Sequence, residues 1–308
     1  MTDNAQSAAP HRPLLGMALG SMAYLCYTVQ DTMVSVMTRI YPAFEIAWSN
    51  CFIALAILTG VIAFRKKEKT FSLMFHTHQL WKHIIRGTLF AVGTAMVFSA
   101  MAHVPLPNMY VIIFFSPLLG AALSGVFLKE PAGKRKVAAV MLGFAGVVVA
   151  MRPGHEGFNA YSLLILGAAL MFGVNALLNR YLATREHASP FIAYPLAAVV
   201  VLLFVPMVWQ FKPVAVQHWI VLLLMGICLA AALSLSARAF RYAPVYLIAP
   251  CQLLQFLWGT LAQLFVYGKW PQHHTWMGAV MIITSNILML VLQYQSSRKP
   301  PAIVDPVP

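Results

Sequence analysis

The chain has 308 residues, of which 60% are hydrophobic and only 9% are charged, and its formal net charge is +13. Because about a quarter of the residues of soluble domains are charged, this composition excludes a water-soluble globular protein and indicates a helical membrane protein. The positive charge does not indicate nucleic-acid binding, because Lys and Arg fall in short gaps between apolar runs and form no basic face interleaved with aromatic residues.

Apolar runs of about 20 residues, bounded by charges, Pro or Gly, predict ten membrane-spanning helices. In chain order they cover approximately residues 14–38, 44–64, 82–103, 107–128, 136–152, 160–182, 190–209, 216–237, 244–267 and 274–294. The polar residues 1–13 lack the layout of a cleaved signal peptide, so we expect the first span to be retained. The fifth span is the shortest.

The basic residues are distributed unequally between the two sides that ten spans define. One side has only four of the 21, namely Arg39, Arg152, Lys212 and Lys269. The termini and the even-numbered connections carry the others. By the positive-inside rule, both termini are predicted to be cytoplasmic, and the protein is predicted to be a multi-pass protein of the bacterial inner membrane. A nine- or eleven-span arrangement would destroy this bias.

Asp31 stands out because it lies well inside the first predicted span, where an acidic residue is costly in hydrocarbon. One interpretation makes it the coupling site of a transporter, binding a proton or a cationic group of a solute. Burial among apolar neighbours disfavours the charged carboxylate, as a proton-coupling residue requires. The other interpretation is a structural Asp that is protonated or hydrogen-bonded to a neighbouring helix.

The two halves of the sequence resemble each other. Aligning Asp31 with Asn175 also aligns Ser35 with Asn179, and Pro residues open the following span in both halves. Each unit has five spans, an odd number, so the second must enter the membrane from the opposite side. We therefore predict an all-α membrane protein of ten transmembrane helices in two inverted five-helix repeats. The predicted parts are an N-terminal tail (1–13), a first repeat (14–153), a second repeat (154–295) and a C-terminal tail (296–308), with both tails cytoplasmic.

Aromatic and amide side chains cluster on the first, second, fourth, sixth and ninth predicted spans. Such residues sandwich flat or cationic groups by stacking and cation–π contact, although Tyr and Trp also favour the membrane interface for structural reasons. Together with Asp31, the predicted substrate-binding residues are Tyr24, Tyr27, Trp48, Asn108, Tyr110, Phe114, Asn175, Tyr246, Gln252, Gln255 and Trp258.

Other features favour structural roles. All four Cys lie in apolar runs and are predicted to be small buried hydrophobic residues. Pro117 and Pro250 lie within spans, where they free backbone carbonyls and bend helices. The His residues of HTHQLWKH (76–83) and PQHH (271–274) are expected in loops on opposite sides, without a metal. No HExxH, Walker loop or GxGxxG occurs, so we expect no cofactor, no metal and no ATP-driven transport.

The order and spacing of several segments resemble the drug/metabolite transporter superfamily, specifically its ten-span EamA-type members. The resemblance extends over residues 14–295. It rests on Asp31 and on the segments PAFEIAWSN (42–50), RG (86–87), PNMYVIIFFSPLLGAALSGVFLKE (107–130), GFAGVVVAMRP (143–153), AP (249–250) and WPQHHTWMGA (270–279). The pattern is most similar to the branch that contains S-adenosylmethionine uptake carriers and related metabolite carriers.

The chain also departs from that family at three positions. Asn50 stands where many relatives have Arg, Lys269 stands where Glu usually ends the ninth span, and Asn175 stands where some relatives carry Asp. These departures put an anion-pairing role for position 50 in doubt.

The prediction from these residues and this resemblance is a secondary-active transporter. It would move a small polar organic solute, such as S-adenosylmethionine or another cofactor-like compound, by alternating access, coupled to protons or by exchange. An exporter of amino acids, metallophores or drug-like compounds is the alternative within the family. Outside it, the alternatives are an intramembrane lipid-modifying enzyme and a non-transporting receptor or scaffold. The expected partners are the solute and the lipid bilayer, without nucleic acid, and the sequence leaves open a monomer or a homodimer.

Overall fold

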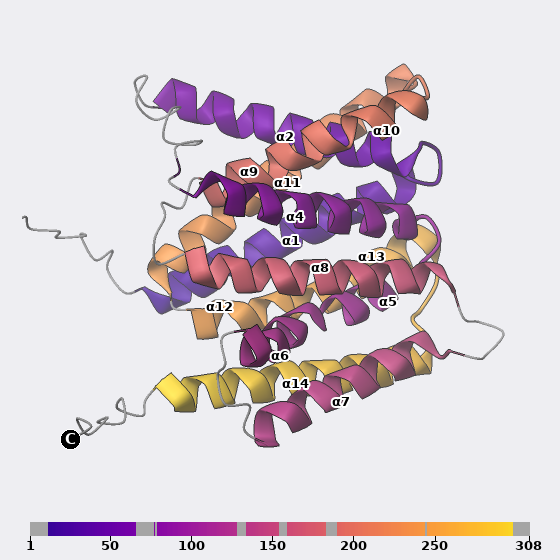
Figure 1. The fold of residues 1–308 in the computed structure, drawn as a ribbon. Helices are drawn as coiled ribbons and strands as arrows, with labels where there is room; N and C mark the ends of the chain where they lie inside the picture. The colour runs from indigo at the N-terminus through magenta and orange to yellow at the C-terminus, as the bar shows by residue number, and fades with distance from the viewer. Residues whose placement is uncertain are drawn as a thin grey trace, which may run out of the picture.

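The structure is a computed structural model that describes residues 12–65, 77, 79–127, 134–153, 159–182, 190–243 and 245–297. Regular structure in these residues is helical throughout, and most helices run roughly along one common direction (Figure 1). The elements are α1 (Pro13–Met37), α2 (Ala43–Arg65), α4 (Leu80–Met101), α5 (Leu106–Ile113), α6 (Ser116–Phe127), α7 (Lys134–Met151), α8 (Tyr161–Leu182), α9 (Pro190–Leu202), α10 (Phe204–Trp209), the 3-10 helix η1 (Val216–His218), α11 (Trp219–Tyr242), α12 (Val245–Gln252), α13 (Leu254–Tyr267) and α14 (His273–Ser297).

Each predicted span falls on one helix or on two consecutive helices. Within the described residues, seven stretches are long and apolar enough to cross a membrane, and α9 is a shorter apolar helix. A helix of 25 residues, such as α1, is about 37 Å long and exceeds the roughly 30 Å of a hydrocarbon core. The prediction of an all-α, multi-pass membrane protein is therefore confirmed.

Three of the spans are built from two helices each. The breaks lie at Phe114–Phe115 between α5 and α6, at Leu203 between α9 and α10, and at Leu253 between α12 and α13. Pro117 and Pro250 lie within three residues of two of these breaks, as expected for residues that remove a backbone donor. The carbonyl of Phe114 accepts a hydrogen bond from Asn286 Nδ2 of α14 at 3.0 Å, so this break is held by a side chain.

Helices from the two ends of the sequence pack against each other. α1 runs along α11, and α4 runs along α8; in addition, α11 contacts α2, and α4 contacts α9. α7 and α14 form a pair at one side of the bundle, as Figure 1 shows at its lower edge. The two halves are therefore interleaved, and the centre of the bundle is lined by helices of both.

Glycines allow close approach at two of these crossings. A Cβ on Gly87 of α4 would lie 2.7 Å from Ala198 Cβ of α9. A Cβ on Gly226 of α11 would overlap the side chain of Ile53 of α2. Small residues let helix backbones approach in a membrane. The α4–α9 and α11–α2 contacts thus both depend on a glycine at the helix crossing.

The histidine prediction was partly wrong. His83 lies in α4 with no exposed surface, and His273 and His274 are the first two residues of α14. His83 is buried because its ring stacks on Tyr194 of α9, at 4.9 Å between ring centroids. The predicted span 82–103 already contained His83, so the loop assignment disagreed with that span, and α4, which begins at Leu80, carries the residue into the bundle. His76 and His78 lie outside the described residues.

Candidate functional site

A cavity of about 230 Å³ lies in the middle of the bundle, between helices of both halves. Its walls come from α1, α2, α4, α5, α8, α11 and α13. The polar lining residues are Tyr27, Gln30, Asp31, Asn50, Thr94, Tyr110 and Gln255. The remaining lining residues are Cys51, Phe90, Val97, Phe98, Met109, Ile113, Phe172 and Leu229. The cavity therefore combines aromatic and aliphatic walls with a few converging polar groups, which is typical of small-molecule sites.

Asp31 is held in this cavity by a hydrogen bond from another helix. Tyr110 Oη of α5 donates to Asp31 Oδ2 at 2.9 Å. Tyr110 is only 2% exposed, and its ring stacks on that of Phe114, with 6.1 Å between centroids and an interplanar angle of 15°. The buried ring fixes the hydroxyl, and the hydroxyl orients one carboxylate oxygen, Oδ2, of Asp31.

The charge of the cavity is set by one side chain. Among the described residues that line it there is no Lys or Arg, and Asp31 is the single Asp or Glu. Asn50 of α2 lines the same cavity, is 1% exposed, and has no hydrogen-bond partner for Oδ1 among the described residues. An Arg at this position would place a cation in the same cavity as Asp31. With Asn50, the cavity offers a carboxyl group and a free amide oxygen. This combination favours solutes that carry hydrogen-bond donors or a positive charge.

Four predicted residues meet in this cavity, namely Tyr27, Asp31, Tyr110 and Gln255. Tyr27 and Asp31 project from one face of α1, as their spacing predicted. Gln255 is 8% exposed in the first turn of α13, immediately after the break at Leu253. Two further predicted residues lie directly behind the walls: Tyr24 contacts Tyr27 at 6.0 Å between ring centroids, and Phe114 supports Tyr110.

The structure places two predicted residues elsewhere. Trp48 of α2 turns toward α9 and α10, where its Nε1 donates to the carbonyl of Val200 at 2.9 Å and its ring stacks on Phe52 at 4.8 Å. Asn108 Oδ1 accepts a hydrogen bond from Thr275 Oγ1 of α14 at 2.7 Å. Asn108 lines a separate hollow of about 200 Å³ near the start of α5.

Three further predicted residues, Asn175, Gln252 and Trp258, are not among the described residues that line the central cavity. Asn175 of α8 is 8% exposed, and its Oδ1 has no hydrogen-bond partner among the described residues. Gln252 ends α12 and Trp258 lies one turn into α13; both are half-buried. The side chain of Tyr246 lies outside the described residues.

The sequence interpretation missed several lining residues. Gln30 neighbours Asp31 and lies on the buried side of α1, with 3% exposure. Thr94 and Phe90 of α4 and Phe172 of α8 are ordinary residues of apolar spans, so nothing in their local sequence distinguishes them. Gln30 had a detectable signal, because an amide in a membrane span is uncommon.

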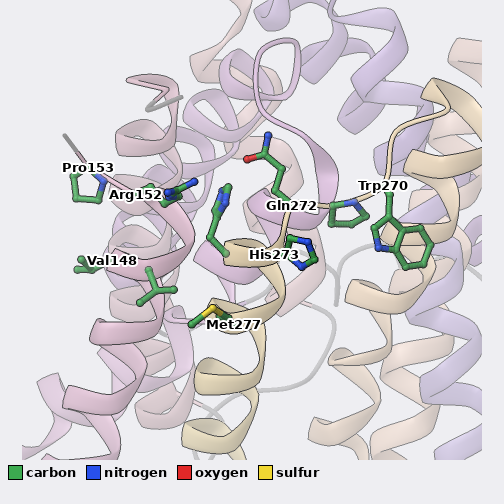
Figure 2. A pocket seen from close by; sticks show the side chains of 10 residues that line it. Val148, Arg152, Pro153, Trp270, Gln272, His273 and Met277 are labelled. Atoms are coloured by element: carbon green, nitrogen blue, oxygen red, sulfur yellow. The ribbon is translucent and has the colours of Figure 1, made fainter. Parts of the chain in front are cut away.

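A larger hollow of about 830 Å³ lies at the ends of α7 and α14 (Figure 2). Arg152, Gln272 and His273 bring polar groups to it, and Met277 and Val148 line its side. Every lining residue except Pro271 is at least partly exposed, so this hollow is a surface groove. None of the predicted binding residues lies in it. The central cavity is therefore the better candidate site, although it is smaller.

A multi-pass helical membrane protein with a polar cavity enclosed between its helices has the arrangement of a solute carrier. The chain belongs to the EamA-like transporter family, which it matches over residues 14–152 and 159–291. It is 26% identical to the riboflavin transporter of Vibrio cholerae, over 94% of this chain and 97% of that protein. It is 22% identical to the S-adenosylmethionine uptake transporter of Rickettsia bellii, over 92% of this chain and 96% of that protein.

These comparisons confirm the family predicted from the sequence. The family and the relatives have the names of transporters rather than enzymes. A crystal structure with 20% sequence identity superposes with a TM-score of 0.62, over 91% of this chain and 98% of that chain. At this identity the superposition shows only that the two chains share a fold.

Proposed function

We propose that the protein is a secondary-active transporter that carries a small, flat, polar metabolite across the bacterial inner membrane by alternating access. Asp31 binds a proton or a cationic group of the solute, and Tyr27, Asn50, Tyr110 and Gln255 contact the rest of it. The observation that carries this proposal is the central cavity, whose walls come from both halves of the chain and whose described lining residues include one carboxylic acid, Asp31.

Three features support two inverted repeats, residues 14–153 and 154–295, that rock about this cavity. The family matches the chain in two stretches of similar length. The packing of α1 on α11 corresponds to that of α4 on α8, and the α4–α9 contact corresponds to the α11–α2 contact. Broken spans, α5–α6 and α12–α13, occur at the same place in each half. Discontinuous helices at a repeat interface are typical of secondary transporters.

The size and chemistry of the cavity limit the range of solutes that fit it. Its volume of about 230 Å³ is below the roughly 300–1,000 Å³ of pockets that enclose drug-sized ligands. In this conformation it accommodates a ring system rather than a whole cofactor-sized molecule. S-adenosylmethionine combines an adenine ring with a sulfonium cation, which suits amides, aromatic rings and Asp31. Riboflavin offers a larger flat ring without a positive charge. We favour uptake or exchange of an S-adenosylmethionine-like solute.

The experiment uses the purified full chain in proteoliposomes with labelled S-adenosylmethionine and labelled riboflavin. We expect saturable flux of one of them, and at least about ten-fold slower flux in Asp31→Asn, because a hydrogen bond to a charged group contributes about 1.5–3 kcal/mol. Glu45→Gln is the matched control. Glu45 is also a buried acid, but its Oε2 accepts a hydrogen bond from the backbone of Lys212 at 3.0 Å, away from the cavity.

Each outcome separates the candidate functions. Flux that needs Asp31 and not Glu45 supports the carrier and its site. Flux that is equal in wild type and Asp31→Asn at every pH refutes the role of Asp31. Efflux from loaded vesicles without uptake supports the exporter alternative. Chemical turnover of lipid without solute flux supports an intramembrane enzyme, and binding without either supports a receptor.

The orientation of the chain in the membrane is part of the same proposal. Arg12, Lys82 and Lys134 mark the ends where α1, α4 and α7 begin, whereas Arg39 and Arg152 lie just beyond the opposite ends of α1 and α7. Cytoplasmic termini follow from the positive-inside rule. A reporter that is active only in the cytoplasm should be active when fused to either terminus, and inactivity at both would invert the topology.

A further inference from the structure

Arg86 is a buried cation that the transport site does not use. It lies two turns into α4 and is 1% exposed. Its Nη2 donates to the backbone carbonyl of Phe191, at the start of α9, at 2.5 Å. Its guanidinium also lies over the Phe191 ring, 4.7 Å from the centroid. One backbone carbonyl and one aromatic ring therefore cover the charge.

These contacts leave most of the guanidinium unsatisfied. Nε and Nη1 are buried and have no hydrogen-bond partner among the described residues, and no carboxylate contacts them there. A buried charge without a counter-ion is costly, and an ionisable residue inside a membrane protein is by default a candidate for function. Three remaining N–H donors, on Nε and Nη1, point to an anionic acceptor that is absent in this conformation.

Packing does not explain why an Arg occupies this position. Arg86 immediately precedes Gly87, which lets α4 approach α9. In the other half, Met225 immediately precedes Gly226, which lets α11 approach α2. Met225 is fully buried. A flexible apolar side chain thus fills the corresponding place at the corresponding helix crossing, so the guanidinium serves something other than volume.

Arg86 also shares a helix face with the central cavity. Phe90, Thr94 and Val97 line the cavity from α4, and Arg86 precedes Phe90 by four residues on that face. Phe90 and Phe172 lie 5.8 Å apart between ring centroids and form the cavity wall nearest to Arg86 along α4. Arg86 is therefore positioned behind the two Phe residues, one turn closer to the start of α4.

The distance along the bundle keeps Arg86 and Asp31 from neutralising each other. Ser35 Oγ lies 3.4 Å from the carbonyl of Met101, which sets the register of α1 against α4. Asp31 is one turn earlier and so is level with Val97. Eleven residues separate Val97 from Arg86, which corresponds to roughly 16 Å of helix. The two charges thus lie at different depths on one route.

We propose that Arg86 is a second solute-binding site, which recognises an anionic group of the solute, a carboxylate or a phosphate, on the far side of the Phe90–Phe172 pair from Asp31. The inference rests on the proposed transport function. Movement of α9 away from α4 would uncover the guanidinium as the cavity opens toward the start of α4. A solute with a cationic part and an anionic part would meet Asp31 and Arg86 in succession.

The first experiment needs no transported solute. The melting temperature of the detergent-purified full chain is measured as inorganic phosphate replaces chloride at constant ionic strength, and separately with added phosphatidylglycerol. We expect phosphate to raise the melting temperature of wild type by about 2–4 °C, through binding to the folded state. Arg86→Met should lose this rise. Arg152→Met, which removes one exposed cation, should keep it.

The second experiment compares two solutes that differ only in a carboxylate, S-adenosylmethionine and its decarboxylated analogue. In proteoliposomes, Arg86→Met should raise the KM for S-adenosylmethionine about ten-fold or more, as expected for a lost charge-assisted hydrogen bond, and change the KM of the analogue less than about two-fold. Arg86→Lys keeps the positive charge and should retain part of the difference in KM between the two solutes. It therefore distinguishes the loss of an anion-binding group from a folding defect of the Arg86→Met variant.

Several outcomes would overturn the inference. These are a wild-type protein that phosphate does not stabilise, an equal phosphate response in Arg86→Met, stabilisation by phosphatidylglycerol alone, or an equal loss of transport for both solutes. If wild type carries neither solute, the transport proposal fails for this solute class, whereas the phosphate response still decides whether Arg86 binds an anion.

Discussion

Replacing Tyr110 with Phe tests whether the Asp31 carboxylate is fixed by a neighbouring helix. The Tyr110 Oη donates to Asp31 Oδ2 at 2.9 Å, and Tyr110 is 2% exposed, so no bulk water replaces the lost donor. Removing the donor from the half-buried Asp31 carboxylate costs about 1–3 kcal/mol, because a hydrogen bond to a charged group is lost. Tyr110→Phe should therefore lower the free energy of unfolding by that amount in an otherwise wild-type chain. In an Asp31→Leu background, which has no acceptor, it should cost less than about 0.5 kcal/mol.

The measurement is unfolding by titration with a denaturing detergent in mixed micelles, carried out on all four members of the double-mutant cycle. Tyr267→Phe provides the control, because its hydroxyl lies 2.9 Å from Ser35 Oγ and does not contact Asp31. It should have the same cost in both backgrounds. Equal costs of Tyr110→Phe in the two backgrounds would refute the proposed orientation of Asp31, whatever their size.

Two further pairs of variants test the packing and the site. Gly226→Ala should destabilise the protein by about 1–3 kcal/mol, because its new methyl group overlaps Ile53, whereas Gly60→Ala, with no atom within 4 Å of its Cβ, should be neutral or stabilising by about 0.5–1 kcal/mol. Unfolding in mixed micelles measures both, and equal costs would contradict the close helix crossing. Gln255→Ala should weaken solute binding by about 0.5–1.5 kcal/mol, whereas Trp48→Phe should leave the KM for uptake nearly unchanged. A larger effect for Trp48 would place the solute toward α9 instead.

The fold was predictable because the bilayer imposes a simple constraint. A span must satisfy its own backbone hydrogen bonds over about 30 Å, so apolar runs and the charges between them define the helices directly. The positions of the breaks were less predictable. Pro117 indicated a bend, but the turn itself falls at Phe114–Phe115, where Asn286 of a distant helix accommodates the exposed carbonyl.

The site was only partly predictable, because the rotation of a helix about its own axis is hard to read from an apolar sequence. α1 carried enough polar residues to reveal its inner face, so Tyr27 and Asp31 were identified. α2 has apolar residues on all of its sides, so its pattern does not reveal an inner face; the sequence suggested Trp48, whereas the structure turns Asn50 toward the cavity. The cavity residues of α4 and α8 are apolar or small and had no distinguishing signal.

The proposed repeat and the proposed transport function together give the charge pattern a meaning. If the two halves are related as we propose, corresponding helix crossings use the same small residues, so packing repeats from one half to the other. The chemistry does not repeat, because Asp31 corresponds to Asn175, and Arg86 corresponds to Met225. Asp31 and Arg86 therefore both belong to the first half, at different depths along α1 and α4. If the proposed transport function holds, the two halves present a solute with unequal groups at two depths of its route. Unequal groups at the two depths would distinguish entry from exit in a carrier with two related halves.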